Sequence, residues 1–247
     1  MINSYNKFAY IYDELMNDFD YQDWYRYIEE IFIRYKKEPK EILEMACGTG
    51  NLSYYFARDG YKLTCFDASH EMLSMAYKKL NRFKNIKMLN LDMIDFNLNK
   101  KFDCVLSICD SINYITDKDD LLIVFKNVWN HMKDDGVFIF DINSEYKLKN
   151  IIGNNTFIED RGDIYYSWEN YFDEEENICD FYLTFFLSED GINFIRFDEE
   201  HRERAYSSIE ILELLRKAGF KGGECFECFT FEEPNARSER LNFIAFK

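Results

Sequence analysis

Residues 41–58 constrain the fold of this chain more than any other segment. A short apolar run leads into a loop that contains Gly48 and Gly50, and apolar residues at helical spacing resume at Leu52. This pattern predicts a strand, a tight loop and a helix N-terminus, an arrangement in which the backbone can approach a ligand closely. The acidic Glu44 stands within the motif and indicates a ligand that presents positive charge or hydroxyl groups there.

Beyond this unit, strand-like and helix-like segments alternate along the chain. Such alternation implies an α/β fold with a doubly wound, mostly parallel sheet and right-handed crossovers. Two further segments, near residues 225–231 and 241–246, complete a predicted seven-stranded sheet. The other predicted strands are residues 41–45, 63–66, 86–91, 102–108 and 137–140, and the predicted helices are residues 52–58, the segment after Ser69, and residues 121–132.

The pattern changes after about residue 153. Polar turns separate three extended segments, which predicts a small antiparallel β meander inserted after the fifth strand; these segments are residues 163–172, 178–188 and 192–204. A capping box at Ser207 and Glu210 opens the next helix. The predicted domains are an N-terminal helical lid segment at residues 1–38, a main α/β domain at residues 39–153 and 205–247, and the inserted β subdomain at residues 154–204.

Charge and composition exclude several partners. Acidic residues number 46 and basic residues 30, for a formal net charge of −16, and no basic cluster stands out, so we expect no nucleic-acid partner. No apolar run approaches the roughly 18 residues of a membrane helix, and no basic segment followed by an apolar one marks a secretory signal. Seven cysteines, an odd number, are typical of a reduced, cytoplasmic protein. Cys225 and Cys228 form one C-x-x-C pair without a second at zinc spacing, so we expect no metal site.

Acidic residues follow the first three predicted strands. Glu44, Asp67 and Asp92 occupy these positions, and ligands of open α/β sheets bind outside the carboxyl ends of the strands. An acid at the end of the second strand is well placed to accept hydrogen bonds from both hydroxyls of a ribose. The loop lacks the last glycine of a dinucleotide fingerprint, because Ser53 stands there, and it lacks the lysine of a Walker loop. A nucleoside-bearing cofactor of another kind is therefore predicted.

The motif Glu44-x-Ala46-Cys47-Gly48-Thr49-Gly50, together with Asp67, Asp92 and the run at residues 106–114, resembles class I S-adenosylmethionine-dependent methyltransferases. The resemblance covers nearly the whole chain. It implies a Rossmann-like methyltransferase fold, S-adenosylmethionine as cofactor, and methyl transfer as the reaction. One departure is Ala46, where the family often has glycine.

The resemblance also implies roles for the loop and the first two strand ends. Gly48 and Gly50 would let the loop, with Ala46 in it, contact the methionyl and adenosyl parts of the cofactor. Glu44 would lie near the methionine amine, and Asp67 would hold the ribose hydroxyls.

Five more cofactor contacts are implied by the same resemblance. Ala68 or Ser69 would lie beside the adenine, Asp92 would accept a hydrogen bond from its N6 amine, and Met93 would pack against the ring. Cys109 and Asp110, at the end of the fourth strand, would face the methionine moiety and the transferred methyl group.

An aromatic segment near the N-terminus is the first candidate for the acceptor side. Tyr5, Phe8, Tyr10 and Tyr12 either fold over the cofactor as a lid or pack their rings onto the sheet. The segment also resembles small-molecule methyltransferases, including sugar-amine N-methyltransferases. We expect Tyr10 to contact the substrate and Tyr12 to act in catalysis.

Three polar residues are further candidates on the acceptor side. His201 has a suitable intrinsic pKa for a general base, and a surface or salt-bridged histidine is the alternative. Arg204 either anchors a substrate carboxylate or pairs with a neighbouring acid. Asn113, in the run after the fourth strand, is expected to contact the substrate.

These observations predict a cytoplasmic, S-adenosylmethionine-dependent methyltransferase that acts on an amine or hydroxyl of a small molecule by in-line transfer. Two alternatives stay open from the sequence: a nicotinamide-dependent oxidoreductase, and a non-catalytic nucleoside-binding protein on the same fold. We expect a monomer or a homodimer, and no membrane partner.

Overall fold

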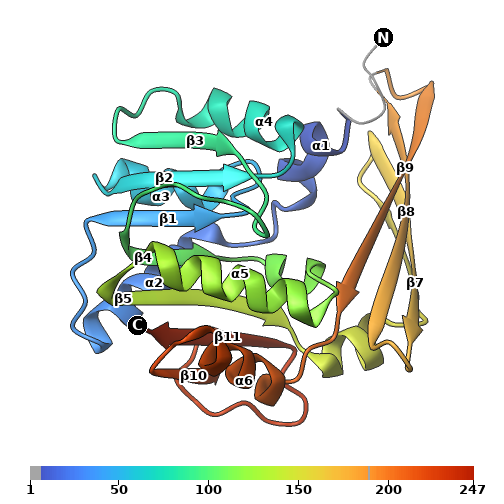
Figure 1. The fold of residues 1–247 in the computed structure, drawn as a ribbon. Coiled ribbons are helices and arrows are strands. Elements are labelled where there is room, and N and C mark those ends of the chain that lie inside the picture. Colours follow the sequence, from blue (N-terminus) through green and yellow to red (C-terminus); the bar gives the residue numbers. More distant parts are fainter. Residues whose placement is uncertain (1–6, 189) are drawn as a thin grey trace.

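The structure is a computed structural model that describes residues 7–188 and 190–247. Its first sheet has seven strands in the order β10-β11-β5-β4-β1-β2-β3 (Figure 1). Strands β1 to β5 run parallel, whereas β11 is antiparallel to both β5 and β10. The strands are β1 (Glu41–Met45), β2 (Lys62–Asp67), β3 (Ile86–Asn90), β4 (Phe102–Ser107), β5 (Met132–Asn143), β10 (Gly222–Glu227) and β11 (Arg240–Phe246). The predicted doubly wound, mostly parallel seven-stranded sheet is confirmed.

Helices cover both faces of this sheet (Figure 1). One face carries α2 (Tyr21–Arg34), α3 (Asn51–Arg58) and α4 (His70–Leu80), and the other carries α5 (Lys118–His131) and α6 (Ser208–Ala218). Ser69 caps α4 as predicted, and the capping box of Ser207 and Glu210 opens α6. None of the helices in the described part of the chain is long and apolar enough to cross a membrane.

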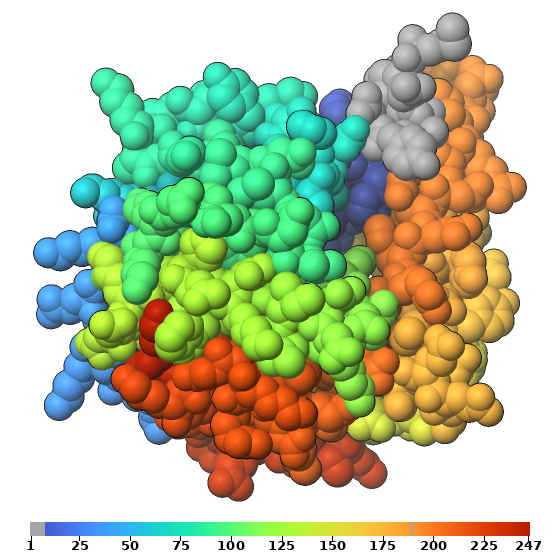
Figure 2. All heavy atoms as spheres, viewed as in Figure 1, coloured from blue at the N-terminus to red at the C-terminus, as the bar shows by residue number. Residues whose placement is uncertain are grey.

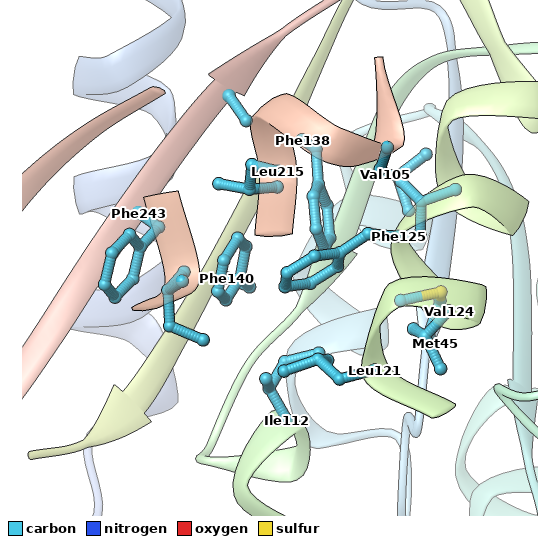
Figure 3. Packing of buried hydrophobic residues seen from close by; sticks show 14 of the residues in the cluster. Met45, Val105, Ile112, Leu121, Val124, Phe125, Phe138, Phe140, Leu215 and Phe243 are labelled. Carbon is cyan, nitrogen blue, oxygen red and sulfur yellow. The ribbon is translucent and has the colours of Figure 1, made fainter. Parts of the chain in front are cut away.

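Side-chain alternation along β5 divides the core between the two faces. Val137 and Ile139 pack toward α2, while Phe138 and Phe140 pack toward α5 and α6. Figure 3 shows the second cluster, in which Phe140 stacks on Phe243 of β11 with ring centroids 5.0 Å apart and ring planes 8° apart. A strand buried on both faces reads as a continuous apolar run, which is why the sequence pattern located it.

A second sheet stands beside the carboxyl ends of the first (Figure 1). It is antiparallel, with the strands β6 (Thr156–Asp160), β7 (Ile164–Asp173), β8 (Ile178–Ser188) and β9 (Phe194–Arg204) in that order. The sequence predicted three of these strands and missed β6. All five residues of β6 are exposed, so the strand has no alternation of buried and exposed residues to reveal it.

Three connections complete the chain. The helix α1 (Lys7–Leu15) lies between α4 and the second sheet (Figure 1). A 3₁₀ turn, η2 (Ser111–Tyr114), follows β4, and a π-helical turn, η3 (Lys147–Ile152), leads from β5 to β6. The fifth strand is longer than the predicted residues 137–140: β5 begins at Met132, pairs irregularly with β4 between Phe102 and Cys104, and continues to Asn143.

Candidate active site

A cavity of about 750 Å³ opens where the parallel strands end. The strand ends supply one wall, the helix α1 a second, and the inner face of the antiparallel sheet a third. In Figure 2 the dark blue atoms of α1 are visible between the teal atoms of the main domain and the orange strands. Eight residues singled out from the sequence line it: Tyr12, Ala46, Gly48, Asp67, Met93, Cys109, Asp110 and His201.

Asp67 ties the glycine loop to the end of β2. Its carboxylate accepts hydrogen bonds from the Gly48 amide at 2.8 Å and from the Ser69 amide at 2.8 Å. Burial raises the pKa of Asp67, because the charged form loses hydration there. A carboxylate held in this way at a cavity wall retains lone pairs for ligand hydroxyls. The geometry suits the ribose-binding role that the resemblance implies.

The left-handed backbone of the loop explains its two glycines. Gly48 has φ +54° and Gly50 has φ +77°, and both values favour glycine. A Cβ added at Gly50 would lie 2.6 Å from Leu80 Cδ1 of α4, whereas one at Gly48 would meet no atom within 4 Å. Gly50 therefore serves close packing against α4, and Gly48 leaves the cavity wall open. Ala46 also has a positive φ, +50°, which gives a physical reason for glycine at this position in the family.

We expect Gly50→Ala and Gly48→Ala to separate stability from ligand binding. Both variants carry the left-handed strain of about 1 kcal/mol, and only Gly50→Ala adds overpacking of about 1–3 kcal/mol. Thermal or urea unfolding should thus show a larger loss for Gly50→Ala, while calorimetry should show weaker cofactor binding for Gly48→Ala. Equal destabilisation by both substitutions would contradict the packing role of Gly50.

Glu44 lies behind the loop and is 3% exposed. It lines a smaller cavity of about 60 Å³ together with Tyr12 and Gly48, and it accepts a hydrogen bond from Ser53. Burial raises its pKa to about 8, and no cation is among the described groups that act on it. A ligand ammonium beside Glu44 would supply the missing positive charge. The buried carboxyl group of Glu44 therefore fits the ammonium group at the amino-acid end of S-adenosylmethionine.

Three other predicted cofactor contacts lie outside the lining of the main cavity. Asp92 is exposed, and its carboxylate accepts a hydrogen bond from the Ile94 amide at 2.8 Å. Ala68 is exposed as well, and Gly50 faces α4. Met93 and Met72 supply apolar surface near Asp67 instead. Contacts of Asp92 and Ala68 with adenine stay predictions from the resemblance.

The end of β4 is held in place by residues that sequence reasoning missed. Cys109 and Asp110 both have a positive φ, and their amides donate to the buried Asp141 carboxylate at 2.7 and 3.1 Å. Arg240 pairs with Asp110 at 2.7 Å and also with Asp141. Asp141 was visible as an acid after the predicted fifth strand, but nothing in the sequence placed Arg240 near it.

Neither Tyr10, Asn113 nor Arg204 lines the cavity. Tyr10 is 65% exposed on α1. Asn113 is buried, and its side chain hydrogen-bonds the backbone of Asn143 and the Arg204 carbonyl, so it joins β5 to β9. The Arg204 guanidinium donates to the Thr116 carbonyl at 3.2 Å and lies over the Tyr206 ring. These contacts give Asn113 and Arg204 structural roles.

The predicted catalytic pair, Tyr12 and His201, does reach the cavity. Burial raises the pKa of Tyr12 well above its ordinary value, so the hydroxyl stays protonated. The His201 ring lies 5.7 Å from Phe8 and 5.8 Å from Tyr114, centroid to centroid. Burial lowers its pKa, so the imidazole is neutral at pH 7.

The helix α1 is attached to both sides of the cavity. Asp13 accepts hydrogen bonds from Thr49 at 2.6 Å and Asn51 at 2.9 Å, and it pairs with Lys79 at 3.0 Å. From the other side, Arg161 donates to the Glu14 carbonyl at 2.9 Å. Residues of α1 line the cavity, and Phe8 packs on Phe185 of the second sheet, while a lid over the cofactor stays a prediction. Tyr5 lies outside the described residues.

The fold also gathers lysines that the sequence leaves apart. Lys62, Lys84, Lys87 and Lys100 line a second cavity of about 560 Å³, near the amino ends of β2 and β3. The sequence analysis found no basic cluster because these residues are separated along the chain. They come together only when β2 pairs with β3 and the segment before β4 packs beside them.

Comparison with known proteins agrees with this geometry. The methyltransferase-domain family matches residues 42–136. The chain is 36% identical to YqeM of Bacillus subtilis (strain 168), a protein provisionally named a methyltransferase, over 98% of this chain and 97% of the relative. A crystal structure of an S-adenosylmethionine-dependent methyltransferase from Clostridium acetobutylicum ATCC 824 is 38% identical, covers 99% of both chains and superposes with a TM-score of 0.88.

The chain therefore belongs to the class I S-adenosylmethionine-dependent methyltransferases, and S-adenosylmethionine is its cofactor. Part of it is similar to a sugar-nucleotide enzyme as well. The dTDP-3-amino-3,4,6-trideoxy-alpha-D-glucopyranose N,N-dimethyltransferase of Streptomyces venezuelae is 28% identical over 42% of this chain and 43% of that protein.

Proposed function

We propose that this methyltransferase acts on an amine or hydroxyl group of a small molecule held between the strand ends and the antiparallel sheet. The observation that carries the proposal is the cavity of about 750 Å³ between these elements. Small-molecule sites have volumes of about 300–1,000 Å³, so a cofactor and a small acceptor together fill this one. The sugar-nucleotide dimethyltransferase to which part of the chain is similar supports an amine acceptor.

S-Adenosylmethionine supplies a methyl group that its sulfonium already activates. The protein then has to orient the acceptor and exclude water. Asp67 and Glu44 would hold the cofactor, with the loop at Gly48 beside it, and the fixed turn at Cys109 and Asp110 would set the wall beside the reacting atoms. The aromatic residues facing that wall are the groups best suited to exclude water; they are Phe8, Tyr114, Tyr166, Trp168, Phe181 and Phe185.

Tyr12 and His201 are proposed to act on the acceptor. The Tyr12 hydroxyl is a protonated donor that borders both the main cavity and the cavity beside Glu44, so it would position a group at their junction. Neutral His201 would accept a proton from the acceptor. An amine needs only its neutral form, whereas a hydroxyl requires such a base.

Replacing His201 by Asn should distinguish the two acceptor classes. For a hydroxyl acceptor, loss of a general base should lower kcat by about 10²–10⁴-fold, and for an amine the loss should be small. Because burial lowers the His201 pKa, its neutral form persists below the ordinary value of about 6.5. Wild-type kcat should therefore fall only at a more acidic pH, and the Asn variant should lack that step. An unchanged pH profile in the variant would remove His201 from the mechanism.

The proposed function is tested by transfer of a labelled methyl group to a panel of small amines and alcohols. Tyr12→Phe serves as a variant that keeps the ring and removes the hydroxyl. Labelled product from at least one small acceptor is expected, with a lower rate in the variant. Transfer only to protein or nucleic acid would contradict a small-molecule acceptor.

The remaining expectations follow the same proposal. We propose residues 1–38 as the lid, residues 154–204 as the acceptor-binding insertion, and residues 39–153 and 205–247 as the cofactor domain. All seven cysteines are free, which supports a cytoplasmic location, and we propose a monomer or homodimer without a nucleic-acid partner. The oxidoreductase and non-catalytic alternatives are set aside, because the relatives that match over the whole length are methyltransferases.

A further inference from the structure

One end of the active-site cavity carries a group of polar side chains that methyl transfer does not use. Asn143 lies at the end of β5, Lys147 begins η3, and Glu203 is near the end of β9. All three line the cavity. We call them the polar end.

Asn143 organises the polar end. Its Nδ2 donates to the Glu203 carboxyl at 2.8 Å, and its Oδ1 accepts from Lys147 Nζ at 2.9 Å and from Arg240 at 3.3 Å. The backbone of Asn143 is held in turn by Asn113. The three side chains are therefore fixed before any ligand arrives.

Lys147 has unused hydrogen-bonding capacity. An ammonium group has three donors, and the hydrogen bond to Asn143 is the one that the described residues give its Nζ. No carboxylate of residues 7–188 or 190–247 lies within ion-pair distance of it, whereas Arg240 is already paired with Asp110 and Asp141. Burial, followed by the charge of Arg240, lowers the pKa of Lys147, and an anion beside the amine would reverse that shift.

Glu203 adds a second donor. It is 3% exposed, and burial together with Asp110 raises its pKa well above the ordinary value. This shift favours the neutral carboxylic acid, which can donate a hydrogen bond.

The aromatic wall beside the polar end has a further unpartnered donor. Trp168 lines the cavity and packs in the same cluster as Leu148 of η3. Its Nε1 is buried without a hydrogen-bond partner among the described residues. Lys147 and Trp168 therefore both keep donor capacity that the described residues do not use.

We propose that the methyl acceptor carries a carboxylate, which Lys147 binds at the polar end of the cavity, beside Glu203. This inference rests on the proposed small-molecule function and narrows its substrate class. Lys147 would be the main specificity determinant, because a carboxylate placed there forms a charge-assisted hydrogen bond with it, and a neutral analogue does not.

The test uses the full chain saturated with S-adenosylhomocysteine. Acetate, butyrate and phenylacetate are each titrated against their primary amides by calorimetry. At least one carboxylate should bind about tenfold or more tightly than its amide. Lys147→Gln should weaken that carboxylate by about tenfold to a hundredfold, the range expected when a hydrogen bond to a charged group is lost, without changing affinity for the amide.

Lys149→Gln is the matched control. Lys149 lies in the same turn, but it pairs with Glu174 at 2.7 Å and does not line the cavity. The substitution should leave both affinities unchanged. A folding defect in Lys147→Gln is detected by its affinity for S-adenosylhomocysteine, which should equal that of the wild type.

Two results would overturn the inference. One is that no carboxylate of the panel binds better than its amide, and the other is that Lys147→Gln keeps the preference. If wild-type protein binds S-adenosylhomocysteine and methylates uncharged acceptors alone, the proposed function stands and only the carboxylate assignment fails. If no small acceptor is methylated at all, the proposed function fails first.

Discussion

Replacing Asp67 by Ala should lower the affinity for S-adenosylmethionine by about a hundredfold or more. A carboxylate that accepts two ribose hydrogen bonds contributes about 1.5–3 kcal/mol for each. The substitution also releases the Gly48 and Ser69 amides, which Asp67 holds at 2.8 Å each. The glycine loop would then lose its anchor, and isothermal titration with the cofactor measures the combined effect.

Two variants separate binding from folding in this experiment. Asp67→Asn keeps the shape of the side chain, but its one carbonyl oxygen can accept from only one of the Gly48 and Ser69 amides, so stability should fall by about 1–3 kcal/mol, and urea unfolding measures this loss separately from the loss of binding. Asp92→Ala removes an exposed acid whose recorded partner is the Ile94 amide. We expect the Asp92 variant to lose less affinity than the Asp67 variant. The reverse order would move the main cofactor contact away from Asp67.

Replacing Arg240 by Leu should destabilise the fold by about 3–5 kcal/mol, because removal of one partner of a buried ion pair leaves uncompensated charge. Arg240 pairs with Asp110 and with Asp141, and the Asp141 side chain is fully buried. Urea unfolding measures the loss. Arg237→Leu is the matched control, since Arg237 is exposed in the same segment, and its effect should stay within about 0.5 kcal/mol.

The pH dependence of this loss has a definite sign. Burial already raises the pKa of Asp141, and the Arg240 charge opposes the rise. Without Arg240 the folded-state pKa rises further above the unfolded value of about 3.9. An acid with a raised folded-state pKa loses stability as pH increases through that pKa, so the deficit of the Leu variant should shrink toward acidic pH. A deficit that is constant with pH would show that lost packing, and not charge, is the cause.

Sequence patterns predicted the main sheet because its strands are buried on both faces. The apolar runs of β4 and β5 and the caps at Ser69 and Ser207 depend on local sequence, so the sequence located these elements even where their exact ends differ. The edge strand β6 has no pattern of buried apolar residues, since every residue in it is exposed. Burial, and not strand formation itself, is what the pattern reports.

For the candidate site, several of the predicted residues that line the cavity follow strand ends, whereas Tyr12 lies on α1 and His201 within β9. Asp67, Cys109 and Asp110 are placed there by the carboxyl ends of neighbouring parallel strands, a rule that needs only the order of elements. Asn113 and Arg204 do not line the cavity, because their side chains donate to backbone carbonyls that join β9 to neighbouring segments. Local sequence does not show which tertiary partners a polar side chain will find.

The sequence by itself determined the class of fold and the cofactor, since both depend on short contiguous patterns: a strand, two glycines and an acid at the next strand end. Only the tertiary structure decided the acceptor end of the cavity. Asn143, Lys147, Glu203 and Arg240 come from different elements and meet through hydrogen bonds between residues up to 97 positions apart. The contact of Arg240 with Asn143 depends on the pairing of β11 with β5, and the contact of Glu203 with Asn143 depends on how the second sheet docks against the first. No local sequence pattern encodes these contacts.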